Sequence, residues 1–238
     1  MENSSAASNE VWAPMVKRAE KSVDVETDDE ISIVSVRITP PRMQRLMVSI
    51  EGSAPLMTAR LSAKTRDNLL RGMTEVKTPG TRKVREVRSP EAETEAALHR
   101  AAEGWAGFPA SAIRAGMISA CRVAGFKMTL AKLSCFVPAQ GYDVVDGLPL
   151  IEIKGDYEQN VMHVRNATGV IDIRVRPIWR EWSADFLVEF DADQFSPSDI
   201  FNLLQRVGAQ VGIGEGRPDS RASGGLGFGT FQVKVATE

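Results

Sequence analysis

The alternation of hydrophobic and polar positions predicts several β-strands. Residues 170–178 alternate throughout, and we expect residues 183–190 to pair with them. Runs of β-branched and other apolar residues predict further strands over residues 31–38, 45–51, 128–137, 148–154 and 231–235. Most of these strands fall in the second half of the chain.

Other segments have the apolar spacing or the capping residues that are typical of α-helices. The expected helices cover residues 60–73, 89–102, 110–123 and 196–211. The second and the fourth begin with Ser-Pro, which places an N-cap hydroxyl before a proline in the first turn. Gly125 ends the third, and we expect residues 104–108 to form a loop before it.

The order of elements near the C-terminus is strand, strand, helix, strand. This order suits an α+β protein of the ferredoxin-like or RNA-recognition-motif-like kind, with an antiparallel sheet and helices on one face. We expect a disordered acidic arm over residues 1–30, followed by a single domain over residues 31–238. An insertion at about residues 74–92 interrupts that domain, because Thr78-Pro-Gly-Thr disfavours regular structure.

Charge is distributed unevenly along the chain, although the net charge is only −2 over 238 residues. Residues 1–30 carry eight acidic and three basic side chains. Two later segments are locally basic and are expected to attract anions. Their basic residues are Lys77, Arg82, Lys83, Arg85 and Arg88 in the insertion, and Arg165, Arg174, Arg176 and Arg180 around the alternating strand.

Metal, nucleotide and hydrolase sites are poorly supported. His99 and His163 lie at no ligand spacing, so we expect surface or interface histidines without a metal. The glycine-rich C-terminal region lacks the lysine of a P-loop, and no serine-hydrolase elbow is present. Neither Asp28-Asp29 nor Asp191/Asp193 has a partner for acid–base chemistry. We therefore expect no cofactor, no metal and no enzymatic activity.

The cellular environment is predicted from the cysteines and from the N-terminus. Cys121 and Cys135 stand among apolar neighbours, which favours reduced, buried thiols in a cytoplasmic protein. The N-terminal residues lack the pattern of a signal peptide, and no apolar run approaches the length of a membrane helix.

Residues 213–233 contain six glycines, with Arg217 and Arg221 among them. Crowded glycines allow the backbone to approach a ligand closely, and arginines nearby favour a phosphate. Gly224, Gly225 and Gly227 are the candidates for that close approach. The alternative is a long hairpin turn before the final strand, and the loop alone does not decide between the two.

Trp179 and Trp182 flank the basic strand and allow two interpretations. Aromatic rings beside arginines can stack on the bases of single-stranded nucleic acid. The alternative is that both rings belong to the core and that the arginines form a solvated face.

Residues 108–117, Phe-Pro-Ala-Ser-Ala-Ile-Arg-Ala-Gly-Met, resemble the helix-start motif Ile-Pro-Gly-Ser-Ser-Leu-Lys-Gly of the RAMP superfamily of CRISPR-associated proteins. Residues 224–233, Gly-Gly-Leu-Gly-Phe-Gly-Thr-Phe-Gln-Val, resemble the glycine-rich loop and strand that close members of that family. Residues 45–61 are similar to its opening strand and loop. The resemblance covers roughly residues 45–236.

This resemblance implies a modified RNA-recognition-motif fold, like that of backbone subunits that stack along guide RNA. It implies backbone contacts at Ser111 and Arg114 and a basic thumb-like insertion. Ala110 stands where the family has a glycine, and its methyl group disfavours close approach of RNA at that point. The loop from Gly52 to Leu56 lacks the aspartate of target-cleaving subunits, and no histidine precedes His99 as in processing endonucleases, so we expect no cleavage.

The leading hypothesis is a non-catalytic protein that binds a single nucleic-acid strand, RNA before DNA, and assembles along it as a homo-oligomer or larger nucleoprotein. The alternative is a phage structural or interaction protein with a RAMP-like fold that joins or mimics an effector complex without binding nucleic acid.

Overall fold

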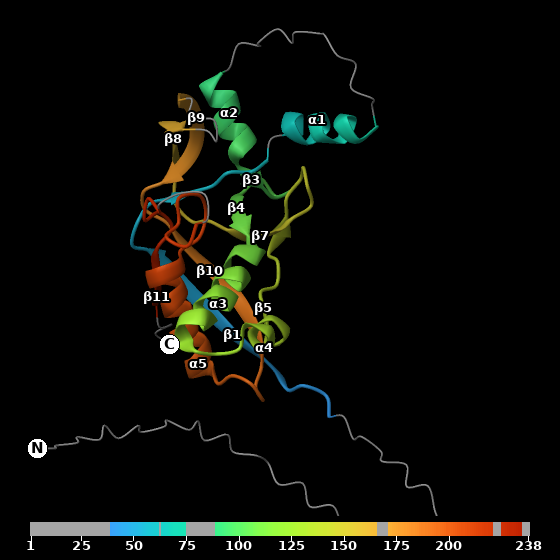
Figure 1. Cartoon of the computed structure of the whole chain (residues 1–238), viewed down its shortest axis with the longest axis vertical. Coiled ribbons are helices and arrows are strands. Elements are labelled where there is room, and N and C mark those ends of the chain that lie inside the picture. The colour runs from blue at the N-terminus through green and yellow to red at the C-terminus, as the bar shows by residue number, and fades with distance from the viewer. Residues whose placement is uncertain (1–38, 62, 75–88, 166–170, 221–224, 235–238) are drawn as a thin grey trace, which may run out of the picture. The chain divides into compact units, whose positions relative to one another are not determined.

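The computed structural model describes residues 39–61, 63–74, 89–165, 171–220 and 225–234, and residues 40–238 group into one unit (Figure 1). The predicted acidic arm and the predicted strand over residues 31–38 lie outside these residues. So do the five basic residues of the insertion.

The central sheet is antiparallel and has the strand order β11-β1-β10-β5. Its strands are β1 (Met43–Gly52), β5 (Cys135–Phe136), β10 (Ser183–Asp191) and β11 (Phe231–Lys234). The longest pairing joins β1 to β10, from Met43 opposite Asp191 to Glu51 opposite Ser183. Strand β11 flanks β1 on its other side, so the C-terminal strand lies beside the first described strand.

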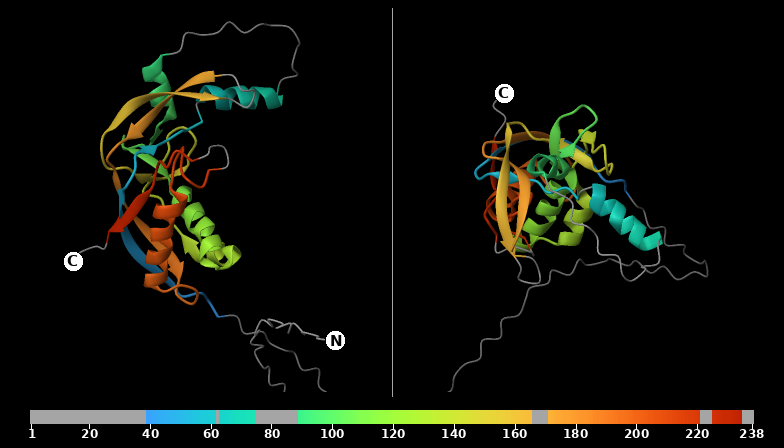
Figure 2. Two further views of the ribbon diagram at one scale, coloured as in Figure 1. Left: turned by 60° about the vertical axis from the view of Figure 1, so that its left-hand side comes forward. Right: turned by 90° about the horizontal axis from the view of Figure 1, so that it is seen from above.

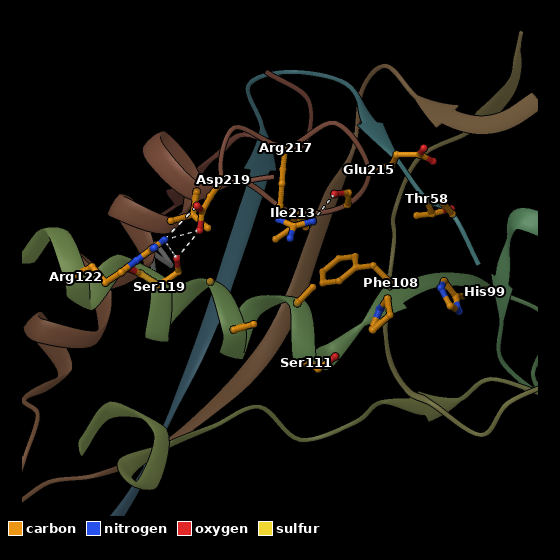
Figure 3. A pocket seen from close by; sticks show the side chains of 18 of the residues that line it. Thr58, His99, Phe108, Ser111, Ser119, Arg122, Ile213, Glu215, Arg217 and Asp219 are labelled. Carbon is orange, nitrogen blue, oxygen red and sulfur yellow. Dashed lines mark hydrogen bonds and ion pairs between the residues drawn. The ribbon is translucent and has the colours of Figure 1, made fainter. Parts of the chain in front are cut away.

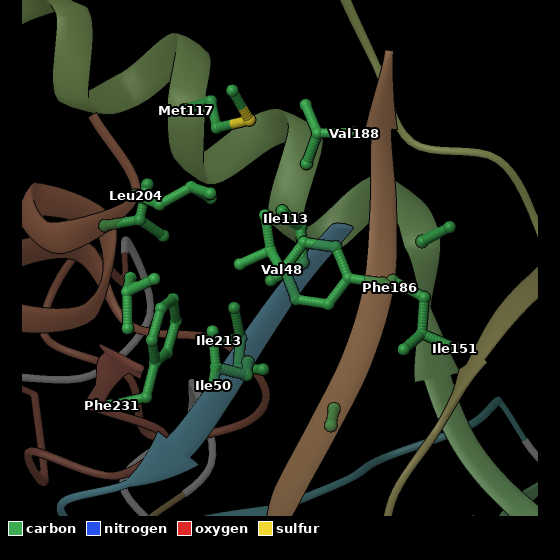
Figure 4. Packing of buried hydrophobic residues seen from close by; sticks show 14 of the residues in the cluster. Val48, Ile50, Ile113, Met117, Ile151, Phe186, Val188, Leu204, Ile213 and Phe231 are labelled. Atoms are coloured by element: carbon green, nitrogen blue, oxygen red, sulfur yellow. The ribbon is translucent and has the colours of Figure 1, made fainter. Parts of the chain in front are cut away.

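Helices α3 (Ala110–Ala124) and α5 (Pro197–Arg206) cover one face of this sheet (Figure 2). Alternate side chains of β10, among them Phe186 and Val188, are buried against the helices. The helices contribute residues such as Met117 and Leu204 to the same cluster (Figure 4). Each fully buried side chain of this size contributes about 1.5–3 kcal/mol of hydrophobic stabilisation, so this layer holds the fold together.

Local signals explain where the two helices begin and end. Ser196 and Asp199 form a reciprocal capping box at the start of α5, with Pro197 in the first turn. A single π-helical turn, η1 (Val207–Val211), continues α5. Helix α3 ends at Gly125, whose φ of 71° is left-handed and favours glycine.

The described residues of the unit also form two smaller sheets and three further helices. One small sheet has the order β2-β9-β8 and the other the order β3-β4-β7-β6, and their pairings are antiparallel. The strands are β2 (Leu56–Met57), β3 (His99–Arg100), β4 (Ala106–Pro109), β6 (Gly141–Tyr142), β7 (Pro149–Glu152), β8 (Tyr157–Arg165) and β9 (Ile171–Trp179). The helices are α1 (Ala63–Thr74), α2 (Pro90–Ala97) and α4 (Met128–Ser134). The α+β class with antiparallel sheets agrees with the expectation from sequence.

Several local predictions are wrong. Residues 128–137 form helix α4 and only the two-residue strand β5, with Ala131 and Ser134 buried at helical spacing. The predicted loop over residues 104–108 is largely strand β4, and α2 ends at Ala97 because His99 and Arg100 pair with that strand. A short apolar run has no period clear enough to separate helix from strand.

The predicted pairing of the two late strands is also wrong. Strand β10 pairs with β1 and β5, whereas β9 pairs with β2 and with β8, a strand that the sequence analysis missed. Sequential strands often pair, as β8 and β9 do, but β10 takes its long partner β1 from the first described part of the chain.

Candidate functional site

A cleft of about 800 Å³ separates helix α3 from the glycine-rich loop (Figure 3). One wall is α3, the facing wall is the loop of residues 211–219, and the end is closed by residues that follow β2 and by β3. The lining residues are Thr58, Ala59, His99, Phe108, Pro109, Ser111, Ala112, Ala115, Gly116, Ser119, Arg122, Met128, Val211, Gly212, Ile213, Gly214, Glu215, Arg217 and Asp219. Motifs that lie about a hundred residues apart therefore share one cavity.

The α3 wall presents small and polar side chains. Ser111, Ala115 and Ser119 are four residues apart and so lie along one side of the helix. At the N-terminus the N-cap residue is Pro109, and no side chain caps the first-turn amides. Ser111, in the first turn, lines the cleft, so the positive end of the helix dipole lies at that end of the cleft, a favourable place for an anion.

The loop wall is held in one conformation by backbone contacts. Gly212, Gly214 and Gly216 have φ angles of 68°, 76° and 79°. A Cβ on Gly214 would lie 2.4 Å from the carbonyl oxygen of Met57, so only glycine fits there. The amide of Glu215 donates to the same carbonyl at 2.8 Å. The loop is therefore a preformed wall.

One end of the cleft carries a charged cluster that joins the two walls. Asp219, on the loop, accepts hydrogen bonds from Arg122 Nη2 at 2.9 Å and from the Ser119 hydroxyl, both on α3. The Ser119 hydrogen bond first, and then Arg122, hold the pKa of Asp219 below its ordinary value. Arg217, nearby on the loop, donates from Nη1 to the carbonyl of Gly214 at 3.2 Å.

The rim of the cleft receives two arginines from strand β9. Arg176 Nε lies 2.9 Å from one carboxylate oxygen of Glu215, and Arg174 Nη1 lies 3.4 Å from the other. Glu215 is a lining residue of the cleft, so the basic face of β9 and the glycine-rich loop adjoin.

His99 is buried at the other end of the cleft and is paired with a carboxylate. Its Nδ1 lies 2.9 Å from Oδ2 of Asp143. The second carboxylate oxygen accepts from the Val145 amide at 2.8 Å and from Arg60 Nη1 at 3.3 Å. Burial alone would raise the pKa of Asp143, but the Val145 amide, His99 and Arg60 together outweigh it and lower that pKa.

The same cluster has ligand atoms of the kinds that metals prefer. One atom each from His99, Asp143 and Asp146 lies within 4.8 Å of the others. The guanidinium of Arg60 already occupies the Asp143 carboxylate and repels a cation, so this arrangement favours the ion-pair network over a metal. The prediction of a surface position is wrong for His99, which is buried, whereas His163 on β8 is exposed.

The structure gathers part of the predicted site around the cleft. Ser111 and Arg217 line the cleft. Arg174 and Arg176 reach its rim, where both form ion pairs with the lining residue Glu215. Gly225 and Gly227 have φ angles of 74° and 76° in the returning part of the loop, where the intervening Leu226 amide donates to Gly216.

Arg114 does not line the cleft, and its side chain is held by other elements. Its Nε donates to the carbonyl of Cys135 at 2.9 Å and its Nη2 to the carbonyl of Lys132 at 2.5 Å. Its guanidinium also lies 5.1 Å from the ring centre of Phe136. This side chain fastens α3 to α4 and β5.

The remaining candidates lie outside the description. The side chain of Arg165 is not described, although its backbone ends β8. Residues outside the described ranges are Lys77, Arg82, Lys83, Arg85, Arg88, Arg221 and Gly224.

The two tryptophans belong to the core. Trp179 is 1% exposed and Trp182 is 4% exposed. The indole of Trp182 donates to the carbonyl of Ala54 at 2.9 Å, and Tyr157 packs against Trp179. Neither ring is open to a base, so the core interpretation is correct for the two rings and the stacking interpretation is wrong. The arginines are not a simple solvated face, because Arg174 and Arg176 pair with Glu215.

The two cysteines are free and buried, as the sequence predicts. Burial raises the pKa of Cys121, and burial together with the neighbouring Cys121 raises the pKa of Cys135 to about 12. A thiol with so high a pKa is a poor nucleophile.

Sequence reasoning missed Ser119, Arg122, Glu215 and Asp219, which supply most of the polar groups between the walls. Ser119 and Arg122 stand three residues apart on a predicted helix, so their shared side could have been anticipated. Nothing in the sequence joins either of them to Asp219.

Neither a scan against protein-family models nor a search of curated proteins found a match for this chain. Within the described part of the chain, none of the helices has the length and apolar character needed to cross a bilayer.

Proposed function

We propose that this protein binds single-stranded nucleic acid, RNA in particular, without cleaving it, and that the sugar–phosphate backbone lies in the cleft between α3 and the loop of residues 211–219. The observation that carries the proposal is that Ser111, in the helix-start motif, and Arg217, in the glycine-rich region, line the same cavity. Because the helix-start motif and the glycine-rich region share one cavity, the two together support the proposal more strongly than either short motif does alone.

The arrangement of the central sheet supports a ferredoxin-like fold of the RNA-recognition type. With the elements of the smaller sheets and the additional helices left aside, β1, α3, β5, β10, α5 and β11 occur along the chain in the order strand, helix, strand, strand, helix, strand. In space the first of these strands lies between the last and the third, with the second at the edge. That order is the one such folds have, and it supports the proposed relationship to the RAMP superfamily.

The polar groups of the cleft suit phosphate better than bases. The amides at the start of α3 and the Ser111 hydroxyl are hydrogen-bond donors, and Arg217 adds a positive charge beside the Arg122–Asp219 ion pair. With Trp179 and Trp182 in the core, no tryptophan among the described residues lines the cleft as a platform for base stacking. We therefore expect binding that depends little on sequence.

Salt dependence and one matched pair of variants test the proposal. Labelled single-stranded RNA and DNA are titrated with the whole chain in filter-binding assays at two salt concentrations. We expect the affinity to fall as salt rises. Arg217→Glu should weaken RNA binding by about tenfold or more and reduce the salt slope by about one.

Arg206→Glu is the matched control, because Arg206 is exposed in the last turn of α5 and does not line the cleft. It changes the total charge equally and should leave binding nearly unchanged. Binding of neither RNA nor DNA at low salt, or equal losses in the two variants, would contradict the proposal.

The proposal includes assembly of several copies along the strand. The alternative function, contact with another protein partner, offers a second explanation for the same exposed surface. Three apolar side chains on the β8–β9 hairpin, Val161, Ile171 and Ile173, are more than half exposed. Such a face favours contact with protein, either a second copy on the same RNA or, in the alternative function, another partner. Mass measurement by light scattering with and without RNA separates the two, since assembly along a strand requires the mass to grow with RNA length.

A further inference from the structure

The imidazole of His99 lines the cleft, and its Nε2 is a hydrogen-bond acceptor that no described residue uses. The residue is 6% exposed and is one of the lining residues. Strand β3 places it opposite Gly107 of β4, the strand that leads directly into α3, so the ring lies near the α3 end where Ser111 stands (Figure 3).

Asp143 sets the tautomer and the orientation of this ring. The carboxylate accepts a hydrogen bond from Nδ1 at 2.9 Å, so in the neutral imidazole the proton is on Nδ1 and Nε2 is an acceptor. Arg60 and the Val145 amide hold the carboxylate in place from the other side. The ring is thus fixed by a network that is itself buried.

Nε2 has no partner within the part of the chain that the structure describes. The hydrogen bonds of His99 there use Nδ1 alone. Among the described residues, the buried side-chain nitrogen that lacks a partner is Nε of Arg66, so Nε2 of His99 is reached by water from the cleft, and a ligand can replace that water. Because His99 lines the cleft, a ligand in the cleft can supply the missing donor.

The chemistry of the strand indicates which donor this is. Phosphate oxygens are acceptors and cannot pair with a neutral Nε2. A ribose 2′-hydroxyl is a donor that lies on the same backbone as the phosphates, and DNA lacks it. The phosphate-binding groups and His99 would then contact neighbouring atoms of one sugar–phosphate chain.

We propose that Nε2 of His99 accepts a hydrogen bond from a ribose 2′-hydroxyl in the cleft and makes the protein select RNA over DNA. This inference rests on the proposed function, and it adds the specificity-determining residue. One such bond contributes a preference of about threefold to tenfold. Asp143 is a positioning residue, because it acts through the ring.

The first arm of the test varies the nucleic acid and leaves the protein intact. Strands of one sequence are made as RNA, as DNA and as 2′-fluoro-RNA, which keeps an RNA-like sugar but cannot donate a hydrogen bond. We expect the wild-type protein to bind RNA about threefold to tenfold more tightly than either analogue. Because the 2′-fluoro strand keeps the shape of RNA, a difference between it and RNA reports the hydrogen bond.

The second arm varies His99. His99→Phe keeps a flat ring and removes both nitrogens, so RNA and 2′-fluoro-RNA should bind equally well. His99→Gln, whose amide oxygen can accept near the position of Nε2, should restore part of the difference. Thermal melts check that each variant is folded, and the comparison of strands on wild-type protein stands if a variant is not.

The outcomes separate the two proposals. Equal affinity of the wild-type protein for RNA and 2′-fluoro-RNA overturns the role of His99 and leaves the nucleic-acid-binding function intact. A preference for RNA that persists unchanged in folded His99→Phe also overturns it. Failure to bind any of the three strands overturns the proposed function itself, and the His99 inference with it.

Discussion

Glu215 of the glycine-rich loop and Arg176 of strand β9 form an ion pair with a separation of 2.9 Å. This pair joins the loop to the small sheet that contains β9, and Arg174 reaches the same carboxylate at 3.4 Å. Two arginines at the rim of the cleft are therefore partly neutralised by one acid from its wall.

Removing that acid should strengthen nucleic-acid binding. Glu215→Gln frees Arg174 and Arg176 to contact phosphate, so we expect several-fold tighter binding. The slope of the logarithm of the binding constant against the logarithm of the salt concentration should become steeper by about 0.7 for each added phosphate contact. Filter binding over a salt series measures both. Glu189→Gln is the matched control, since Glu189 accepts from Arg45 at 2.8 Å and does not line the cleft; a gain of equal size there would contradict the prediction.

Alanine substitutions should distinguish glycines that need space from those that need only a left-handed backbone. Gly229 has a φ of 66°, and a Cβ on it would lie 1.8 Å from the carbonyl oxygen of Ile213. Gly229→Ala should lower the free energy of unfolding by about 3 kcal/mol, because the backbone of Ile213 must move.

Gly227 is the control for that substitution. Its φ is 76°, but nothing lies within 4 Å of an added Cβ. Gly227→Ala should cost only about 1 kcal/mol, the strain of the left-handed conformation. Urea unfolding measures both values, and similar losses for the two variants would show that the loop is not tightly packed at Gly229.

The Asp143 network should give a defined pH dependence of stability. The pKa of Asp143 is lowered in the folded state, so its charge stabilises the fold above the unfolded pKa of about 3.9 and this contribution is lost as the pH falls below it. Asp143→Asn leaves Arg60 nearly buried without its counter-charge and should cost about 3 kcal/mol at pH 7.

At pH 3 the difference between wild type and Asp143→Asn should be smaller, because pH 3 lies below the unfolded pKa of about 3.9 and the unfolded carboxyl then binds a proton that the folded carboxylate resists. Urea titrations at the two pH values measure it. A difference that is the same at pH 7 and pH 3 would show that the charge of Asp143 contributes nothing.

Arg114 should matter for stability and not for binding. Arg114→Gln removes hydrogen bonds to the carbonyls of Lys132 and Cys135, so we expect a loss of about 1–2 kcal/mol in the free energy of unfolding. RNA affinity and its salt slope should stay near those of wild type. Arg217→Gln is the converse comparison, for which we expect weaker binding and little change in stability. If Arg114→Gln reduced the salt slope as much as Arg217→Gln, Arg114 would contact the nucleic acid and the prediction would be wrong.

Much of the secondary structure was predictable because its signals are local. The Ser196-Pro197 start of α5, the end of α3 at Gly125 and the alternation in β9 and β10 follow from capping, backbone freedom and the two-residue period. Helix α4 was missed for the converse reason, since its apolar run from Met128 fits either period. Strand β8 was missed as well.

The candidate site was predictable only in part. Ser111 and Arg217 were recognised by motif, and both line the cleft. His99 was expected at the surface or at an interface, because one isolated histidine in the sequence gives no sign of Asp143, its partner 44 residues later. Arg114 was assigned to the site on the same kind of motif evidence as Ser111, but its neighbours turn its side chain towards α4.

The sequence by itself determined the α+β class and most of the long helices and strands. It also determined the positions where a glycine ends a helix or a side chain caps one, as at Gly125 and Ser196. The tertiary structure decided which of those elements meet: β1 with β10 and β11, Ser111 with Arg217 across a cleft, and Glu215 with Arg176. The division has a physical reason. Caps, turns and periodicity depend on neighbours along the chain, whereas strand partners, buried tryptophans and ion pairs depend on burying the most apolar surface at once, a condition that involves the whole chain.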